Sequence, residues 1–250
     1  MSNHIEFNNV SVSYGGKRAL NDIDLNVEKN EIIAIVGPAN SGKTTFLKCI
    51  NRTIDFISSA NVEGDVLVNG ENVNSLRNVH ALRRRIGMVF PLPVGLPLSV
   101  YENVAYAPRR NGMSDPGQLD ELVERCLKQA VLWDEVRDRL DILGTRLSGG
   151  QQQRLTLARA LSHQPEILCL DEFSIAIDPV TTMKIEDILM TLKKDMTIVL
   201  VTNLTQQARR LADHVAFFNN SRIVEFGDTD QMFNNPTNEL TGQYLHGEVG

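Results

Sequence analysis

The sequence has few cysteines, few aromatic residues and no long apolar run, and each scarcity argues against a class of protein. Its three cysteines, Cys49, Cys126 and Cys169, lie far apart in 250 residues. We therefore expect neither a zinc site nor a disulfide framework, but reduced thiols in a cytosolic protein. No apolar stretch approaches the roughly 18 residues that span a bilayer, and the first residues lack the pattern of a signal peptide. If the protein works at a membrane, we expect another chain to provide the anchor.

The charges of the chain are mixed and do not favour one sign. It has 25 Lys and Arg residues against 31 Asp and Glu, a net charge of −6. Because acids and bases are interleaved, we do not expect a nucleic-acid partner. The apolar fraction of 42% and the charged fraction of 22% are those of an ordinary globular protein. A chain of this length can bury the core of a single α/β domain, and we expect one domain over residues 1–250.

Short apolar runs alternate with helical patterns along the chain, which predicts an α/β fold with a mostly parallel sheet. Alternating or continuous apolar residues predict strands at 5–14, 23–27, 32–36, 66–68, 85–90, 167–170, 197–201 and 223–226. Helical spacing predicts helices from about 42 to 50 and at 151–161, 180–192 and 229–233. Residues 115–145 also have helical spacing, so we expect a helical subdomain at about 91–165.

The segment from Gly37 to Thr44 carries the clearest functional motif. Its sequence, Gly-Pro-Ala-Asn-Ser-Gly-Lys-Thr, matches G-x-x-x-x-G-K-[ST] in full and stands between a predicted buried strand and a helix. A chance glycine turn would not explain that setting. Backbone N–H groups of such a loop wrap the β-phosphate of ATP, and the helix N-terminus adds partial positive charge. We expect the nucleotide to contact Gly37, Pro38, Ala39, Asn40, Ser41, Gly42, Lys43, Thr44 and Thr45.

Within this loop, Lys43 is expected to reach the β- and γ-phosphates, with the Thr44 hydroxyl on Mg²⁺. Two carboxylates, Asp171 and Glu172, directly follow the predicted buried strand at 167–170. Carboxyl ends of parallel strands form the ligand crevice of such sheets, where the phosphate loop also lies. We expect Asp171 to hold Mg²⁺ through water and Glu172 to polarise the attacking water. Taken alone, the Asp-Glu pair could also be a solvated turn.

A second glycine motif follows Leu147. Ser148, Gly149, Gly150 and Gln151 open a predicted helix and offer another set of backbone donors for an anion. A plain Ser-Gly helix cap is the alternative. Since the chain already has one phosphate loop, a second one needs another phosphate, or the same phosphate approached from another molecule.

The order of these three motifs resembles that of the ATP-binding-cassette (ABC) ATPases, and the resemblance covers almost the whole chain. In that family two cassettes stack head to tail, and each Ser-Gly-Gly-Gln segment clamps the γ-phosphate of the ATP held by the other. The resemblance implies a P-loop NTPase cassette with an N-terminal antiparallel β portion, and nucleotide contacts for Ser148 to Gln151. It also implies that Tyr14 stacks on adenine, although a plain strand residue is the alternative.

Within the family, the chain is most similar to the ATPase of bacterial phosphate importers. The segments that carry this likeness are 79–90, 98–108, 132–140, 185–186, 216–218 and 224–230. The likeness implies integral-membrane permease subunits as partners, a peripheral place on the cytoplasmic face of the inner membrane, and inorganic phosphate as cargo. A non-transport regulatory cassette, whose ATP-dependent closure signals to a partner, is the alternative. The sequence leaves open whether the second cassette is an identical copy.

The chain departs from the family pattern at three positions. Pro91 replaces a Gln that touches Mg²⁺ and the attacking water, and Asn203 replaces a His near the γ-phosphate. Ile175 stands where a serine would face the partner cassette. Proline offers no side-chain hydrogen bond, and asparagine carries no positive charge. A lost transition-state contact costs roughly 10²–10³ in rate, so we expect impaired hydrolysis, unless Asn203 and a neighbour replace the missing contacts.

Overall fold

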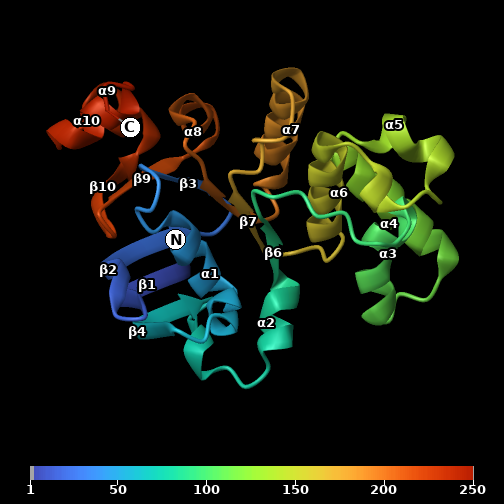
Figure 1. The fold of residues 1–250 in the computed structure, drawn as a ribbon, viewed down its shortest axis with the longest axis horizontal. Helices are drawn as coiled ribbons and strands as arrows, with labels where there is room; N and C mark the ends of the chain where they lie inside the picture. Colours follow the sequence, from blue (N-terminus) through green and yellow to red (C-terminus); the bar gives the residue numbers. More distant parts are fainter. Residues whose placement is uncertain (1–2, 250) are drawn as a thin grey trace.

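Two β-sheets share the core of the molecule, and the computed structural model describes them within residues 3–249 (Figure 1). The strands are β1 (Asn3–Tyr14), β2 (Lys17–Glu28), β3 (Ile32–Val36), β4 (Ala60–Val68), β5 (Glu71–Asn72), β6 (Ile86–Val89), β7 (Ile167–Asp171), β8 (Thr197–Val201), β9 (His214–Asn219) and β10 (Arg222–Asp228). The helices are α1 (Lys43–Ile50), α2 (Val79–Arg85), α3 (Val100–Arg110), α4 (Pro116–Gln129), α5 (Trp133–Val136), α6 (Gly149–Leu161), α7 (Pro179–Leu192), α8 (Thr205–Leu211), α9 (Thr229–Asn234) and α10 (Glu239–Leu245).

The larger sheet is mostly parallel, with strand order β10-β9-β3-β8-β7-β6. Only the β9–β10 pair is antiparallel among these strands. Strands β3, β7 and β8 are buried along their full length, as expected for apolar runs covered on both faces. Because parallel strands end at the same edge, the residues that follow these three strands come together there.

The smaller sheet is antiparallel, with strand order β2-β1-β4-β5. Its inner face packs on α1, where the rings of Phe7 and Phe46 stack with centroids 4.1 Å apart. The expected strand at 23–27 is part of a longer one, β2, because the register with β1 runs from Tyr14 and Lys17 to Asn3 and Glu28. This sheet is the N-terminal antiparallel portion that the sequence predicts.

Helices α3 to α6 gather at one end of the molecule, and α9 and α10 lie at the other (Figure 1). Helix α4 begins where Asp115 caps the N–H of Gln118, and its apolar side packs on α3 and α6. Among residues 3–249 no helix combines the length and apolar character needed to cross a membrane. The sequence did not predict β9 or the helices α2, α8 and α10.

Candidate nucleotide-binding site

The loop between β3 and α1 is shaped by its two glycines. Gly37 (φ 144°) and Gly42 (φ 109°) lie in the left-handed region, and a Cβ at either position would collide with a backbone carbonyl oxygen, that of Phe218 or Ala19. Only glycine fits there without strain. The Ser41 hydroxyl is buried and has no hydrogen-bond partner among the described residues. Ser41 belongs to the loop that the motif assigns to phosphate, so this unpaired hydroxyl is a candidate phosphate contact.

Lys43 lies inside this loop, with a side chain that folds back on the backbone. Its Nζ donates to the carbonyl oxygens of Gly37 (2.6 Å) and Pro38 (2.8 Å). Burial lowers the pKa of Lys43, while the charges of Glu172 and Asp171 oppose that shift. The ammonium is therefore placed at the centre of the loop by two carbonyls that a phosphate oxygen could replace.

Asp171 ends β7 and is buried, with 1% of its surface exposed. Its Oδ2 atom has no hydrogen-bond partner within residues 3–249. Burial raises the pKa of Asp171, and the nearby Thr44 hydroxyl and Lys43 ammonium act against it. An unpaired, buried carboxylate oxygen beside a hydroxyl is costly alone and fits a hard divalent cation. No cluster of three or more His, Cys, Asp or Glu side chains forms a metal cage in the described chain. In proteins Mg²⁺ is usually held by one or two carboxylates together with phosphate oxygens.

Glu172 follows directly, in a left-handed conformation with φ 47°. Its N–H donates to the carbonyl oxygen of Val201 at 2.8 Å, which ties the end of β7 to β8. Its Oε1 accepts a 2.6 Å hydrogen bond from Nδ2 of Asn203, the second residue after β8. The two predicted catalytic side chains are thus in direct contact at the carboxyl edge of the sheet.

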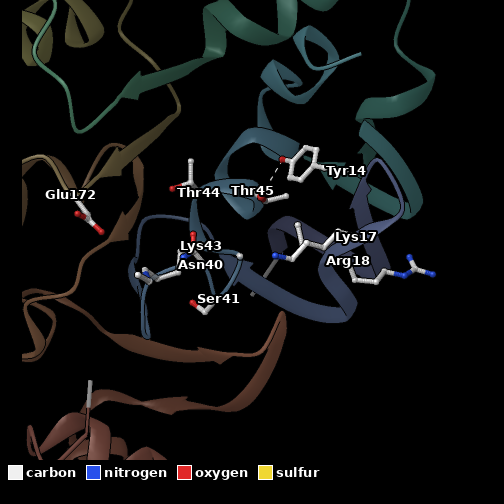
Figure 2. A pocket seen from close by; sticks show the side chains of 12 residues that line it. Tyr14, Lys17, Arg18, Asn40, Ser41, Lys43, Thr44, Thr45 and Glu172 are labelled. Carbon is white, nitrogen blue, oxygen red and sulfur yellow. Dashed lines mark hydrogen bonds between the residues drawn. The ribbon is translucent and has the colours of Figure 1, made fainter. Parts of the chain in front are cut away.

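A cavity of about 540 Å³ opens beside this edge (Figure 2). Predicted site residues that line it are Tyr14, Ala39, Asn40, Ser41, Gly42, Lys43, Thr44, Thr45 and Glu172. The Tyr14 hydroxyl and the Thr45 hydroxyl are 3.1 Å apart, which fixes the aromatic ring at the cavity wall. The cavity is large enough for a nucleotide-sized ligand.

Three lining residues, Lys17, Arg18 and Ala19, were not predicted from the sequence. Figure 2 shows the Arg18 side chain pointing away from the phosphate loop, and it pairs with Glu63 at 3.1 Å. Lys17 has no ion pair among the described residues. The sequence signal for Lys17 was its position directly after the Gly15-Gly16 turn that follows Tyr14. This turn places the Lys17 ammonium at the cavity as a second cation beside Lys43.

The Ser148–Gln151 segment lies outside this cavity, at the start of α6. Ser148 and Gln151 form a capping box, with Ser148 N–H donating to Gln151 Oε1 at 3.0 Å and Gln151 N–H to Ser148 Oγ at 3.4 Å. The helix starts at Gly149, two residues before the prediction. A Cβ at Gly149 would meet open space, whereas one at Gly150 would press on the Ala176 carbonyl oxygen. Within a single chain, residues 148–151 do not line the cavity beside the phosphate loop.

The three departing residues lie at the surface. Pro91 is half-buried after β6, and the preceding Phe90 carbonyl accepts a 2.9 Å hydrogen bond from Gln153 of α6. Ile175 is 68% exposed in the turn between β7 and α7.

Residues 20–174 match the sequence model of the family described as ABC transporter. The chain belongs to the ABC transporter family. It is 47% identical over 238 residues to the phosphate import ATP-binding protein PstB 3 of Streptococcus pneumoniae serotype 4, with 95% of each chain covered. The chain is therefore an ABC transporter ATPase and, among ABC ATPases, resembles PstB.

Solved cassettes have the same fold. A dimeric post-hydrolysis structure of the ATP-binding cassette MJ0796 with ADP and Pi is 28% identical, with a TM-score of 0.78, and the match covers 90% of this chain and 98% of that one. CbiO1 of Clostridium perfringens, part of a CbiONQ complex, is 25% identical, also with a TM-score of 0.78, and the match covers 92% and 90% of the two chains. A bacterial Atm1-family ABC exporter with ATP bound matches 98% of this ABC cassette and 42% of the exporter chain at 24% identity, with a TM-score of 0.85.

Proposed function

We propose that this ABC cassette is the ATP-binding subunit of an importer of inorganic phosphate. The observation that carries the proposal is the 47% identity to a phosphate import ATP-binding protein over 95% of both chains. The whole chain would act as one ATP-binding domain, with the helical part at about 91–165 as a subdomain. It would work at the cytoplasmic face of the cell membrane, bound to integral-membrane permease subunits.

The site residues have the following proposed roles. Residues 37–45 hold the phosphates, and Tyr14 stacks on the adenine ring. Thr44 and Asp171 would hold Mg²⁺, which neutralises charge on the β- and γ-phosphates when bound. The unpaired Oδ2 of Asp171 and the unpaired Ser41 hydroxyl support these two assignments.

Glu172 is proposed to accept a hydrogen bond from the attacking water. Asn203 is proposed to orient Glu172 through their 2.6 Å hydrogen bond. Asn203 has no ionisable proton, and Pro91 has no side-chain donor. We therefore expect intrinsic hydrolysis to be slow. Ser148 to Gln151 would complete the site of a second cassette, whose own segment completes this one; the open space at Gly149 supports that approach.

Phosphate uptake by cells that lack the chain tests the transport assignment. Cells complemented with wild-type protein are expected to take up radioactive phosphate, whereas cells with Lys43→Ala or Glu172→Gln are not. Equal expression of the three proteins is checked by immunoblot, and uptake of an unrelated amino acid serves as the control. Normal phosphate uptake with both variants would contradict the assignment and would favour a cassette that does not energise this transport.

A further inference from the structure

A cluster of buried polar side chains lies next to the catalytic edge of the larger sheet. Its four members come from four different parts of the chain, and each has 8% or less of its surface exposed. They are Ser174 after β7, Glu186 on α7, Thr202 after β8 and Gln207 on α8. Burying polar groups is costly unless they are paired. The partners of these side chains therefore show which segments the cluster holds in place.

Gln207 is the centre of the cluster, because both ends of its amide are used. Its Oε1 accepts a 2.9 Å hydrogen bond from the Thr202 hydroxyl. Its Nε2 donates to Glu186 Oε1 at 3.0 Å and, over a longer distance of 3.4 Å, to Ser174 Oγ. One side chain on α8 thus connects α7 with the segments that follow β7 and β8.

The Thr202 hydroxyl fixes the backbone around Asn203. It donates to Gln207 and accepts a 3.0 Å hydrogen bond from the N–H of Leu204. Asn203 lies between these two bonded residues, and its own exposed side chain donates to Glu172. The place of the Asn203 amide opposite the carboxylate therefore depends on a turn that Gln207 anchors.

The donor end of the Gln207 amide reaches the turn that begins at Glu172. Ser174 lies two residues after Glu172, and in the same turn the Ile175 N–H donates to the Glu172 carbonyl oxygen at 3.3 Å. Both partners of the hydrogen bond between Glu172 and Asn203 are thus carried by segments that one buried side chain contacts.

Glu186 sets the orientation of the Gln207 amide. Arg210, one turn further along α8, donates to both carboxylate oxygens of Glu186, at 2.8 and 2.7 Å. A carboxylate paired with a guanidinium acts as an acceptor, so the NH₂ group of the Gln207 amide has to face it. The amide oxygen is then directed to the Thr202 hydroxyl. The charged pair thereby leaves the amide one favourable orientation.

We propose that Gln207 is a positioning residue for ATP hydrolysis, which holds Asn203 against Glu172 by fixing the turn between β8 and α8. The inference rests on the proposed roles of Glu172 and Asn203 and adds the residue that sets their geometry. Gln207 does not line the nucleotide cavity, so it acts on the rate without touching the nucleotide. A displacement of about 1 Å in a catalytic arrangement can cost roughly 10² in rate, which makes such an anchor important.

A double-mutant cycle on the hydrolysis rate tests the proposal. Gln207→Met keeps the side-chain length and removes the amide, and Asn203→Ala removes the group that Gln207 positions. With phosphate release at saturating ATP, Gln207→Met is expected to lower kcat about tenfold and to change KM less than about twofold. In the Asn203→Ala background, itself slower than wild type, it is expected to lower kcat less than about twofold. Gln206→Met, at the exposed neighbouring position of α8, is the matched control.

Stability provides a readout that separates positioning from folding. Urea denaturation is expected to show a lower midpoint for Gln207→Met in both backgrounds, because the cluster loses the same hydrogen bonds in each. Its effect on kcat, by contrast, is expected only where Asn203 is present. Binding of a fluorescent ATP analogue verifies that each variant is folded.

An exchange of the two partners adds a second test, which decides the matter if Gln207→Met does not fold. Gln207→Glu alone places two carboxylates side by side and is expected to be slow. Combining it with Glu186→Gln restores a donor between the two positions and keeps an acceptor for Thr202, so most of the lost rate is expected to return. Equal kcat of Gln207→Glu and the exchanged pair overturns the proposal.

The outcomes separate the positioning role from the roles on which it rests. If Asn203→Ala is slow but Gln207→Met lowers kcat equally in both backgrounds, or in neither, Gln207 does not act through Asn203 and the proposed role of Asn203 stands. If Asn203→Ala hydrolyses ATP as fast as the wild type, Asn203 does not orient Glu172, and both assignments are wrong.

Discussion

Nδ2 of Asn203 donates a 2.6 Å hydrogen bond to Oε1 of Glu172, although the residues are 31 positions apart. The contact exists because β7 and β8 are parallel neighbours and both residues follow the carboxyl ends of these strands. A side-chain amide can orient the carboxylate, but it cannot exchange a proton with it near neutral pH. Asn203 thus orients Glu172 without being ionisable itself.

This contact predicts how hydrolysis responds to substitution. Asn203→His is expected to raise kcat at saturating ATP, because an imidazole near the γ-phosphate can stabilise transition-state charge, with little change in nucleotide affinity. Adding Pro91→Gln is expected to raise kcat further, although it also frees the backbone and so affects stability. Phosphate release by the wild type, the single variants and the double variant measures this. Glu172→Gln is the inactive control.

The pH dependence of the hydrolysis rate distinguishes asparagine from histidine at position 203. The Asn203→His variant is expected to acquire an additional ionisation in its rate profile near the ordinary histidine pKa of about 6.5. The wild type has no such group at position 203. A fast wild type that neither substitution improves would mean that another residue supplies the missing contact. A slow wild type that becomes fast only with a second, different cassette would indicate a heterodimer.

Lys43 is expected to dominate nucleotide affinity. Lys43→Ala removes the buried ammonium that now rests on the Gly37 and Pro38 carbonyls, and with it the direct charge contact to the phosphates. We expect a loss of at least about tenfold in affinity, since charge-assisted hydrogen bonds contribute about 1.5–3 kcal/mol. Titration with a fluorescent ATP analogue measures it. Lys48→Ala, on the same helix, is the control; equal affinities of folded wild type and Lys43→Ala would refute the assignment.

The sequence predicted the parts of the fold that depend on local patterns. The buried runs at β3, β7 and β8 and the glycine loop after β3 were located from a few adjacent residues, because continuous apolar strands and G-x-x-x-x-G-K-[ST] are local signals. Helix α6 was placed two residues late, because Gly149 and Gly150 are poor helix formers and the capping box of Ser148 and Gln151 overrides that propensity.

The parts that were missed depend on contacts between distant segments. Strand β9 has a short buried run, Val215 to Phe218, and its identity as a strand comes from parallel pairing with β3. The position of Lys17 at the cavity depends on the β1–β2 turn lying beside the phosphate loop. The Asn203–Glu172 bond likewise requires the strand order, which no local pattern specifies.

ATP is expected to drive dimerisation through the Ser148–Gln151 segment. The γ-phosphate would bridge two chains, so ADP should act poorly. In light scattering, Glu172→Gln is expected to double in mass with ATP, because the variant binds without hydrolysis. Adding Ser148→Arg should abolish this, since a long side chain would fill the approach that is open at Gly149. Ser75→Arg, at an exposed position before α2, is the control. A mass independent of ATP in all variants would contradict the head-to-tail arrangement.

The Glu135–Arg154 pair is expected to stabilise the start of α6. Arg154 has only 7% of its side chain exposed, and its Nη1 lies 2.5 Å from Glu135 Oε1, while Gln151 Nε2 donates to Glu135 Oε2 at 2.7 Å. Glu135→Gln removes the charge and leaves a nearly buried guanidinium without a counter-ion. We expect a decrease of about 1–2 kcal/mol in the free energy of unfolding at pH 7. Urea denaturation measures it, with the exposed Glu121→Gln on α4 as the matched control.

The pH dependence of this difference follows from the pKa of Glu135. The hydrogen bond from Arg154, with a smaller contribution from Gln151, lowers that pKa below its ordinary value. A lowered folded-state pKa means that the contribution is fully present above the unfolded pKa, about 4.3, and is lost as the pH falls through the folded pKa. The gap between wild type and Glu135→Gln should therefore be constant from about pH 7 to 5.5 and shrink below about pH 4.3. A gap that stays the same down to pH 3, or one equal to that of Glu121→Gln at pH 7, would show that the charge of Glu135 does not stabilise the start of α6.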